Sequence, residues 1–186
     1  MGAFTMRYLS LLLLPALALP AAAQTTPTTN LGRAATAAEV QAWDISVGPD
    51  GTGLPPGSGT PKDGAAIFAR KCAACHGPNG EGGAEKALVG GKGTLATNNP
   101  QKTIGSYWPF APIVWDYINR AMPRFQEGTL SPDEVYSLTA FLLFRNGVIR
   151  ENDVMDAKTL PKVQMPNRDG FLPAKPQWPV PKENRY

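Results

Sequence analysis

The chain has two cysteines and one histidine, and it places Cys72, Cys75 and His76 together in the segment KCAACHG, residues 71–77. Residues three apart on a helix face the same side, so both thiols can add to the two vinyl groups on one edge of a haem. The imidazole of His76 follows directly and can reach the iron. This C-x-x-C-H pattern is the signature of covalent haem attachment. It predicts one covalent haem c, with His76 as a metal ligand.

Other interpretations use these residues less completely. A structural zinc site takes four ligands, and two cysteines with one histidine leave a position that no second histidine can fill. A thioredoxin-like pair belongs in a βαβ unit, and no such strands are expected here. A simple disulfide would leave His76 without a role.

The elements that would position these groups are helices. The segment from Lys62 to His76 has helix-forming composition, with Ile67 and Phe68 at helical spacing from the cysteines. A second helix is predicted over residues 110–121. The pattern gives it an inner face made of Ile113, Val114, Tyr117, Ile118 and Ala121.

The clearest helix signal covers residues 131–147. Ser131 suits the N-cap, Pro132 the first helical position, Glu134 the capping box and Gly147 the C-terminal stop. A shorter helix should run from a second capping box, Thr36 with Glu39, towards Trp43. No internal repeat is visible.

Irregular segments separate these helices. Residues 77–105 hold eight glycines, and residues 47–61 and 148–186 are rich in turn-forming residues. A porphyrin would supply the apolar body that such a chain lacks. The expected organisation is a signal peptide at 1–23, an N-terminal arm with a short helix at 24–61, a haem domain at 62–147, and a proline-rich basic extension at 148–186.

The composition and the N-terminal segment limit the classes of protein to which the chain can belong. The chain has 186 residues, a net charge of +3 and 42% hydrophobic residues, with no basic stripe that would indicate nucleic-acid binding. Arg7 precedes an apolar run, Tyr8 to Leu19, and the small residues AAA follow it before Gln24. This is the pattern of a cleaved export signal. We therefore expect a periplasmic protein with no membrane insertion after cleavage.

Residues 62–147 resemble the class I (monohaem) cytochrome c family, through GAAIFARKCAACHG, an aromatic helix that ends in MP, and a capped last helix. The resemblance implies an all-α class I cytochrome c fold, with three to four short helices around a covalent haem and extended N- and C-terminal arms. It also implies that the first and last helices cross, so that Gly64 and Phe68 meet residues 138–142.

The sixth iron ligand is assigned to Met122 in the segment RAMPRF, where this family places its ligand. A thioether opposite histidine is the usual solution in cytochromes c. Met165 is the second candidate, and core packing is the alternative role of either methionine.

Further residues of the site are predicted around these ligands. A main-chain carbonyl of residues 84–90 should accept the second ring N–H of His76. Leu88 is expected to pack on the haem. Tyr107 and Trp108 are expected either to donate to a propionate or to pack on the haem edge.

The flanking segments have a more specific resemblance. Five segments are similar to the cytochrome subunits of sulfite and sulfane dehydrogenases of bacterial sulfur oxidation. They are AWDISVGPDGTGLPPGSGT, LVGGKGTLAT, KTIGSYWPFA, DYINRAMP and LPKVQMPNRDGF. The resemblance implies that a molybdopterin-containing subunit oxidises the sulfur compound and passes single electrons to the haem, which passes them to a downstream cytochrome or oxidase. The single haem motif favours the sulfite type or a single-haem variant.

Two other functions stay open at this point. The chain could be a stand-alone soluble electron shuttle to a terminal oxidase, or a haem enzyme in its own right such as a thiosulfate dehydrogenase. The second would require an unusual ligand such as cysteine, and both cysteines are already used. The sequence has no catalytic residues of its own, so we expect an electron-transfer protein. The arms, with Trp43, Phe171 and Trp178, are expected to contact either the partner or their own haem domain.

Overall fold

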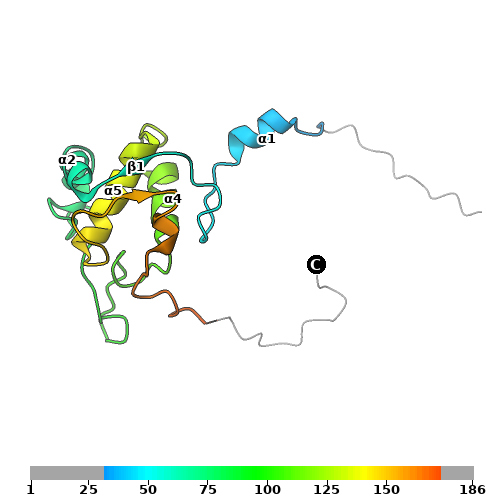
Figure 1. Cartoon of the computed structure of the whole chain (residues 1–186). Helices are drawn as coiled ribbons and strands as arrows, with labels where there is room; N and C mark the ends of the chain where they lie inside the picture. Colours follow the sequence, from blue (N-terminus) through cyan, green and yellow to red (C-terminus); the bar gives the residue numbers. More distant parts are fainter. Residues whose placement is uncertain (1–31, 173–186) are drawn as a thin grey trace, which may run out of the picture.

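The computed structural model describes residues 32–172, so the predicted signal at 1–23 and Trp178 lie outside these residues. A helical domain carries one detached helix on its N-terminal side (Figure 1). The helices and strands are, in order, α1 (Ala37–Trp43), β1 (Ser58–Gly59), α2 (Pro61–Lys71), α3 (Ala73–His76), α4 (Ala111–Ala121), α5 (Pro132–Arg145), β2 (Met155–Asp156) and a 3-10 turn, η1 (Leu160–Lys162). None of the helices in the described range is long and apolar enough to cross a membrane.

Side-chain capping defines where α1, α2 and α5 begin. In α5, Ser131 N–H donates to Glu134 Oε2 at 3.0 Å, and the Ser131 hydroxyl accepts from Glu134 N at 3.3 Å. The same reciprocal pair joins Thr36 and Glu39 at the start of α1. Both capping boxes were predicted from the sequence, and both are confirmed.

The core is built where α2 crosses α5. The rings of Phe68 and Phe141 lie 5.0 Å apart between centroids, and Phe68 is buried. Gly64 lets the two helices approach closely, because a Cβ at this position would overlap Ser137 O and lie 2.7 Å from Phe141 Cβ. The crossing of the first and last domain helices is therefore as expected.

This crossing predicts the effect of Gly64→Ala. The added methyl group meets main-chain atoms of α5, so the helices must separate, and overpacking of this kind costs about 1–3 kcal/mol and occasionally more. Urea unfolding of the haem-loaded protein should show that loss. Ala66→Ser, on the exposed side of α2, is the matched control and should change stability by less than about 0.5 kcal/mol. Equal midpoints for the two variants would contradict this packing.

The buried face of α4 differs from the prediction. Trp115 and Asp116 are buried, whereas Tyr117, predicted on the inner face, is 49% exposed. Trp115 packs on Tyr136 of α5, with ring centroids 5.4 Å apart, and the N-terminal segment lies against Asp116, where Val47 N–H donates to Asp116 Oδ1 at 2.9 Å. Arg120 completes the pairing of this carboxylate from one turn further along α4. Asp116 therefore fixes the point at which the N-terminal arm leaves the domain.

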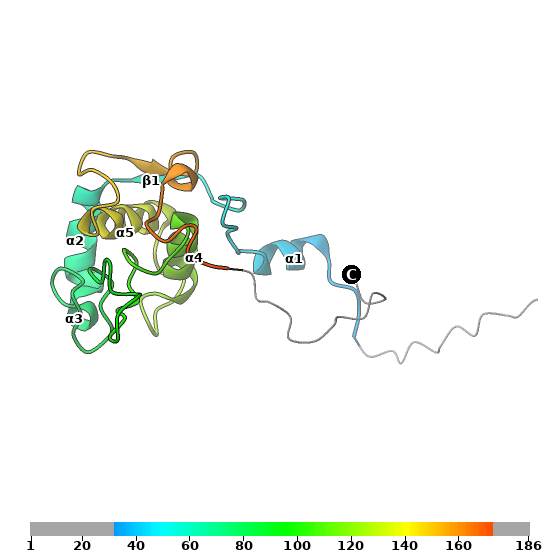
Figure 2. The same ribbon diagram turned by 90° about the horizontal axis from the view of Figure 1, so that it is seen from below.

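The first part of the C-terminal extension packs on its own domain. β2 pairs with β1 in antiparallel register, Ser58 with Asp156 and Gly59 with Met155. Beyond β2, the side chains of Leu160, Val163 and Met165 are buried in the core. Figure 2 shows this layer over α5, on the side of the domain opposite the loops that follow α3. Up to Met165, the extension therefore covers its own domain.

Candidate haem site

The haem-attachment motif follows the break between α2 and α3. α2 ends at Lys71, and Cys72 N–H still donates to Phe68 O at 2.9 Å. The Cys72 carbonyl then starts the next turn, since it accepts from Cys75 N at 3.1 Å and His76 N at 3.0 Å. The helix predicted from Lys62 to His76 is thus divided at Cys72. The cysteines remain one turn apart, and both thiols are free.

The second ring nitrogen of His76 has a defined partner. His76 Nδ1 lies 3.0 Å from Lys86 O, a carbonyl within the predicted range 84–90. Because a carbonyl oxygen only accepts, Nδ1 carries the proton and Nε2 keeps its lone pair for a metal. Hydrogen bonds of this kind fix the orientation of a metal-binding histidine.

The surroundings of Cys72 shift the pKa of its thiol in the direction opposite to that of a redox cysteine. Burial raises its pKa to about 11; Lys71 lowers the pKa and Cys75 raises it further, both with smaller effects. The reactive cysteine of a C-x-x-C redox motif has a lowered pKa, which makes it a thiolate near neutral pH. The only strands in the described part of the chain, β1 and β2, have two residues each and pair antiparallel, so no βαβ unit is present for a thioredoxin-like pair.

The three methionines after the predicted signal occupy two kinds of position. Met155 and Met165 are buried in the core, 5% and 4% exposed. Met122 directly follows α4 as its C-cap and is only half-buried, at the edge of the core. Met165 therefore has the packing role that was considered for it, while Met122 remains our prediction for the axial ligand.

The other predicted site residues lie partly exposed. Leu88 and Trp108 are partly buried and pack against the edge of the core, as Cys72 and Met122 also do. Trp108 makes an edge-to-face contact with Tyr117, with ring centroids 5.6 Å apart. Tyr107 contacts Phe171 in the same geometry at 5.2 Å. No contact in the structure assigns Tyr107 or Trp108 to a propionate, so that role stays a prediction.

Asn146 organises the glycine-rich loop, a role that was not predicted from the sequence. Its side chain accepts from Gly90 N at 3.0 Å and donates to Leu88 O at 3.2 Å and Leu142 O at 2.8 Å. A Cβ on Gly105 would overlap this amide. Asn146 thus ties Leu88 to the end of α5. The only sequence feature that could have indicated this role is the position of Asn146 at the C-cap of α5, directly before Gly147.

These residues fit a covalently bound haem. They supply two free thiols one turn apart, an imidazole with Nε2 available and a thioether at the edge of an apolar surface. Haem bound by Cys72, Cys75, His76 and Met122 would supply one-electron redox chemistry. The chain itself would hold His76 and Met122 in place, and the apolar residues at the edge of the core would exclude water from the haem.

The fold and the site define a small all-α protein with a haem-attachment motif, a c-type cytochrome. Residues 59–142 match the family described as cytochrome c oxidase, cbb3-type, subunit III. A chain in the crystal structure of the sulfane dehydrogenase SoxCD from Paracoccus pantotrophus is 46% identical, with a TM-score of 0.74 over 78% of this chain and 72% of that chain. This chain belongs to the cytochrome c family, whose members transfer electrons through covalently bound haem c.

One weaker similarity has a TM-score too low to support an argument. The thiosulfate dehydrogenase TsdBA from Marichromatium purpuratum, in its as-isolated form, is 26% identical, with a TM-score of 0.35 over 45% of this chain and 17% of that chain. Among curated proteins, none matches the chain significantly.

Proposed function

We propose that this chain is the haem subunit of a periplasmic sulfite or sulfane dehydrogenase. It accepts single electrons from a molybdopterin-containing subunit and passes them to a downstream cytochrome or oxidase. The observation that carries the proposal is the extent of the similarity to SoxCD. The cytochrome c domain match spans less than half of the chain, whereas the similarity to SoxCD covers 78% of it. The shared sequence therefore includes flanking segments that the cytochrome c domain does not account for.

The predicted ligands support electron transfer without substrate chemistry at the iron. If His76 and Met122 both hold the iron, as predicted, no position on it would be left for a substrate. Oxidation of a sulfur compound then requires a second active site, and the proposal places it in the partner subunit.

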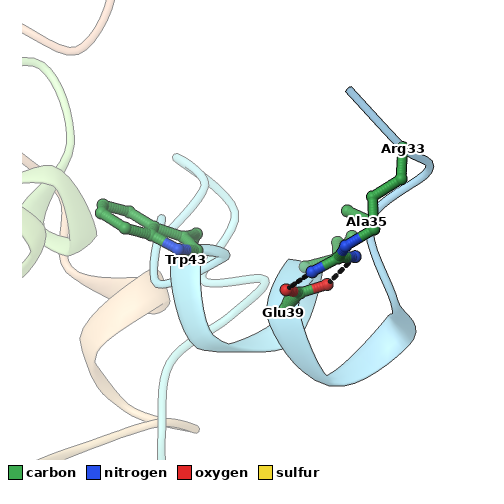
Figure 3. Close-up of a pocket in the computed structure, with 5 residues that line it drawn as sticks. Arg33, Ala35, Glu39 and Trp43 are labelled. Atoms are coloured by element: carbon green, nitrogen blue, oxygen red, sulfur yellow. Dashed lines mark hydrogen bonds and ion pairs between the residues drawn. The ribbon is translucent and has the colours of Figure 1, made fainter. Parts of the chain in front are cut away.

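Helix α1 supplies a surface suited to such a partner. None of its residues is buried, and three large apolar side chains in and beside it are exposed: Val40 at 54%, Trp43 at 87% and Ile45 at 52%. Figures 1 and 2 show α1 apart from the domain, and Figure 3 shows Trp43 one turn from the Arg33–Glu39 ion pair. Seven residues are too few for a stable isolated helix. A partner surface that buries Val40 and Trp43 would stabilise it.

This surface gives a prediction for Trp43→Ala. Aromatic residues dominate the binding free energy of protein interfaces. The variant should bind the dehydrogenase subunit about tenfold more weakly, a loss of about 1.4 kcal/mol, in a titration by calorimetry. Its haem spectrum and melting temperature should stay unchanged, because Trp43 contacts no part of the core. Val154→Ala, another exposed apolar site, is the control, and equal affinities for both variants would contradict the assignment of α1.

The molybdenum-to-iron ratio tests the function itself. The cytochrome should be isolated from its native periplasm under gentle conditions, and both metals measured. A ratio near one supports the dehydrogenase subunit. Iron without molybdenum would favour the stand-alone electron shuttle instead.

A further inference from the structure

An ion pair joins the loop whose carbonyl meets the ring of His76 to the loop that begins at Met122. Arg124 Nη1 donates to Glu85 Oε1 at 3.2 Å. Glu85 directly precedes Lys86, whose carbonyl accepts from His76. Arg124 lies two residues after Met122. The pair therefore links the loop that orients His76 to the loop that presents Met122.

Main-chain hydrogen bonds hold the Glu85 side of this link in place. Glu85 N–H donates to Cys75 O at 2.9 Å, and Glu85 O accepts from Gly83 N at 3.0 Å. The main chain of Glu85 is thus held in place relative to the haem-attachment motif.

The loop on the Arg124 side has a conformation that needs support. Phe125 has a φ of 69°, and it is the one non-glycine residue with positive φ in the described part of the chain. A bulky residue costs free energy in this region, so the conformation persists only where contacts hold it. Burial does not provide them, since Phe125 is 83% exposed. Its N–H donates to Glu127 Oε1 at 2.9 Å, and the Arg124 guanidinium lies 4.9 Å from its ring centroid.

We propose that Glu85 and Arg124 are positioning residues for the axial ligands. Their ion pair holds the loop of residues 122–128 closed against the loop that contains Glu85 and Lys86, and so keeps the Met122 thioether in place. This inference rests on His76 and Met122 as the iron ligands, and it does not depend on which partner donates electrons. Both side chains are partly exposed, at 65% for Arg124 and 45% for Glu85. Such a pair should shift the opening equilibrium of the loop by about 1.5- to 5-fold.

Imidazole titration of the oxidised cytochrome tests this role. Imidazole competes with Met122 for the iron, and the loss of the Met–iron absorption band reports its binding. Glu85→Gln and Arg124→Gln should each tighten imidazole binding by about 1.5- to 5-fold, because each opens the same loop. The double variant should bind no more tightly than the tighter single variant. The charge-exchanged variant, Glu85→Arg with Arg124→Glu, should restore part of the original affinity.

The direction in which each variant changes imidazole affinity distinguishes a positioning role of the ion pair from an effect of charge on the haem. Glu85→Gln removes a negative charge and should raise the reduction potential, whereas Arg124→Gln removes a positive charge and should lower it. The form of imidazole that binds iron is neutral, so only loop opening moves both affinities in the same direction. Arg33→Gln, which breaks the exposed ion pair with Glu39 on α1, is the matched control and should leave imidazole binding unchanged.

Two results would overturn the inference, and they are distinguishable. Unchanged or oppositely shifted imidazole affinities, in a protein that shows the Met–iron band, would remove the positioning role alone. A protein without that band would remove the assignment of Met122, and the inference with it. Neither result bears on the molybdenum-to-iron ratio, which tests the proposed function separately.

Discussion

Replacing Cys72 and Cys75 together by alanine is expected to abolish covalent haem attachment. The two thioether bonds need two sulfur atoms, and the chain has no other cysteine. Haem absorbance that stays with the denatured chain should fall from one haem per chain to zero. Each single variant keeps one bond and should retain haem in lower yield.

Ala74→Ser is the matched control, because it changes an exposed residue inside the same motif and leaves both sulfurs in place. It should retain one haem per chain. Covalent haem in the double variant would show that the attachment site has been assigned to the wrong residues.

The parts of the fold that depend on local sequence were predictable. The capping boxes of Thr36 with Glu39 and Ser131 with Glu134 each involve residues three apart, so the sequence contains the whole interaction. The haem motif is local for the same reason. Its three reactive residues occupy five positions.

Contacts between distant segments were not predictable in this way. Periodicity placed Tyr117 on the inner face of α4, but the arm at Val47 covers the neighbouring residue Asp116 instead. Composition described the C-terminal extension by its prolines and basic residues. It gave no sign that Leu160 and Met165 would enter the core.

The site shows the same division. The need of His76 for an acceptor at its second ring nitrogen predicted a carbonyl within residues 84–90, and the structure identifies Lys86 O. Glu85 and Arg124 are 39 residues apart, and Asn146 lies 56 residues from its partner Gly90. No local sequence pattern predicts either contact, because the two residues of each pair come close only when α5 and the loops pack together.

Met122→His is expected to lower the reduction potential by more than about 0.1 V, within the range of about 0.8 V that axial ligands span. A thioether favours reduced iron more than an imidazole does, so the exchange stabilises the oxidised state. Equilibrium redox titration would give the shift, and the Met–iron band should disappear. Stability should change little, because Met122 is only half-buried at the end of α4.

Met165→Ala is the matched variant, and it should show the reverse pattern. Met165 is 4% exposed in the core, so removing its side chain should cost about 2–5 kcal/mol of unfolding free energy. The band and the potential should stay as they are in the unaltered protein. A core methionine changes stability without changing the haem spectrum, whereas an iron ligand changes the spectrum first. A lost band in Met165→Ala, with the band kept in Met122→His, would therefore transfer the sixth ligand to Met165.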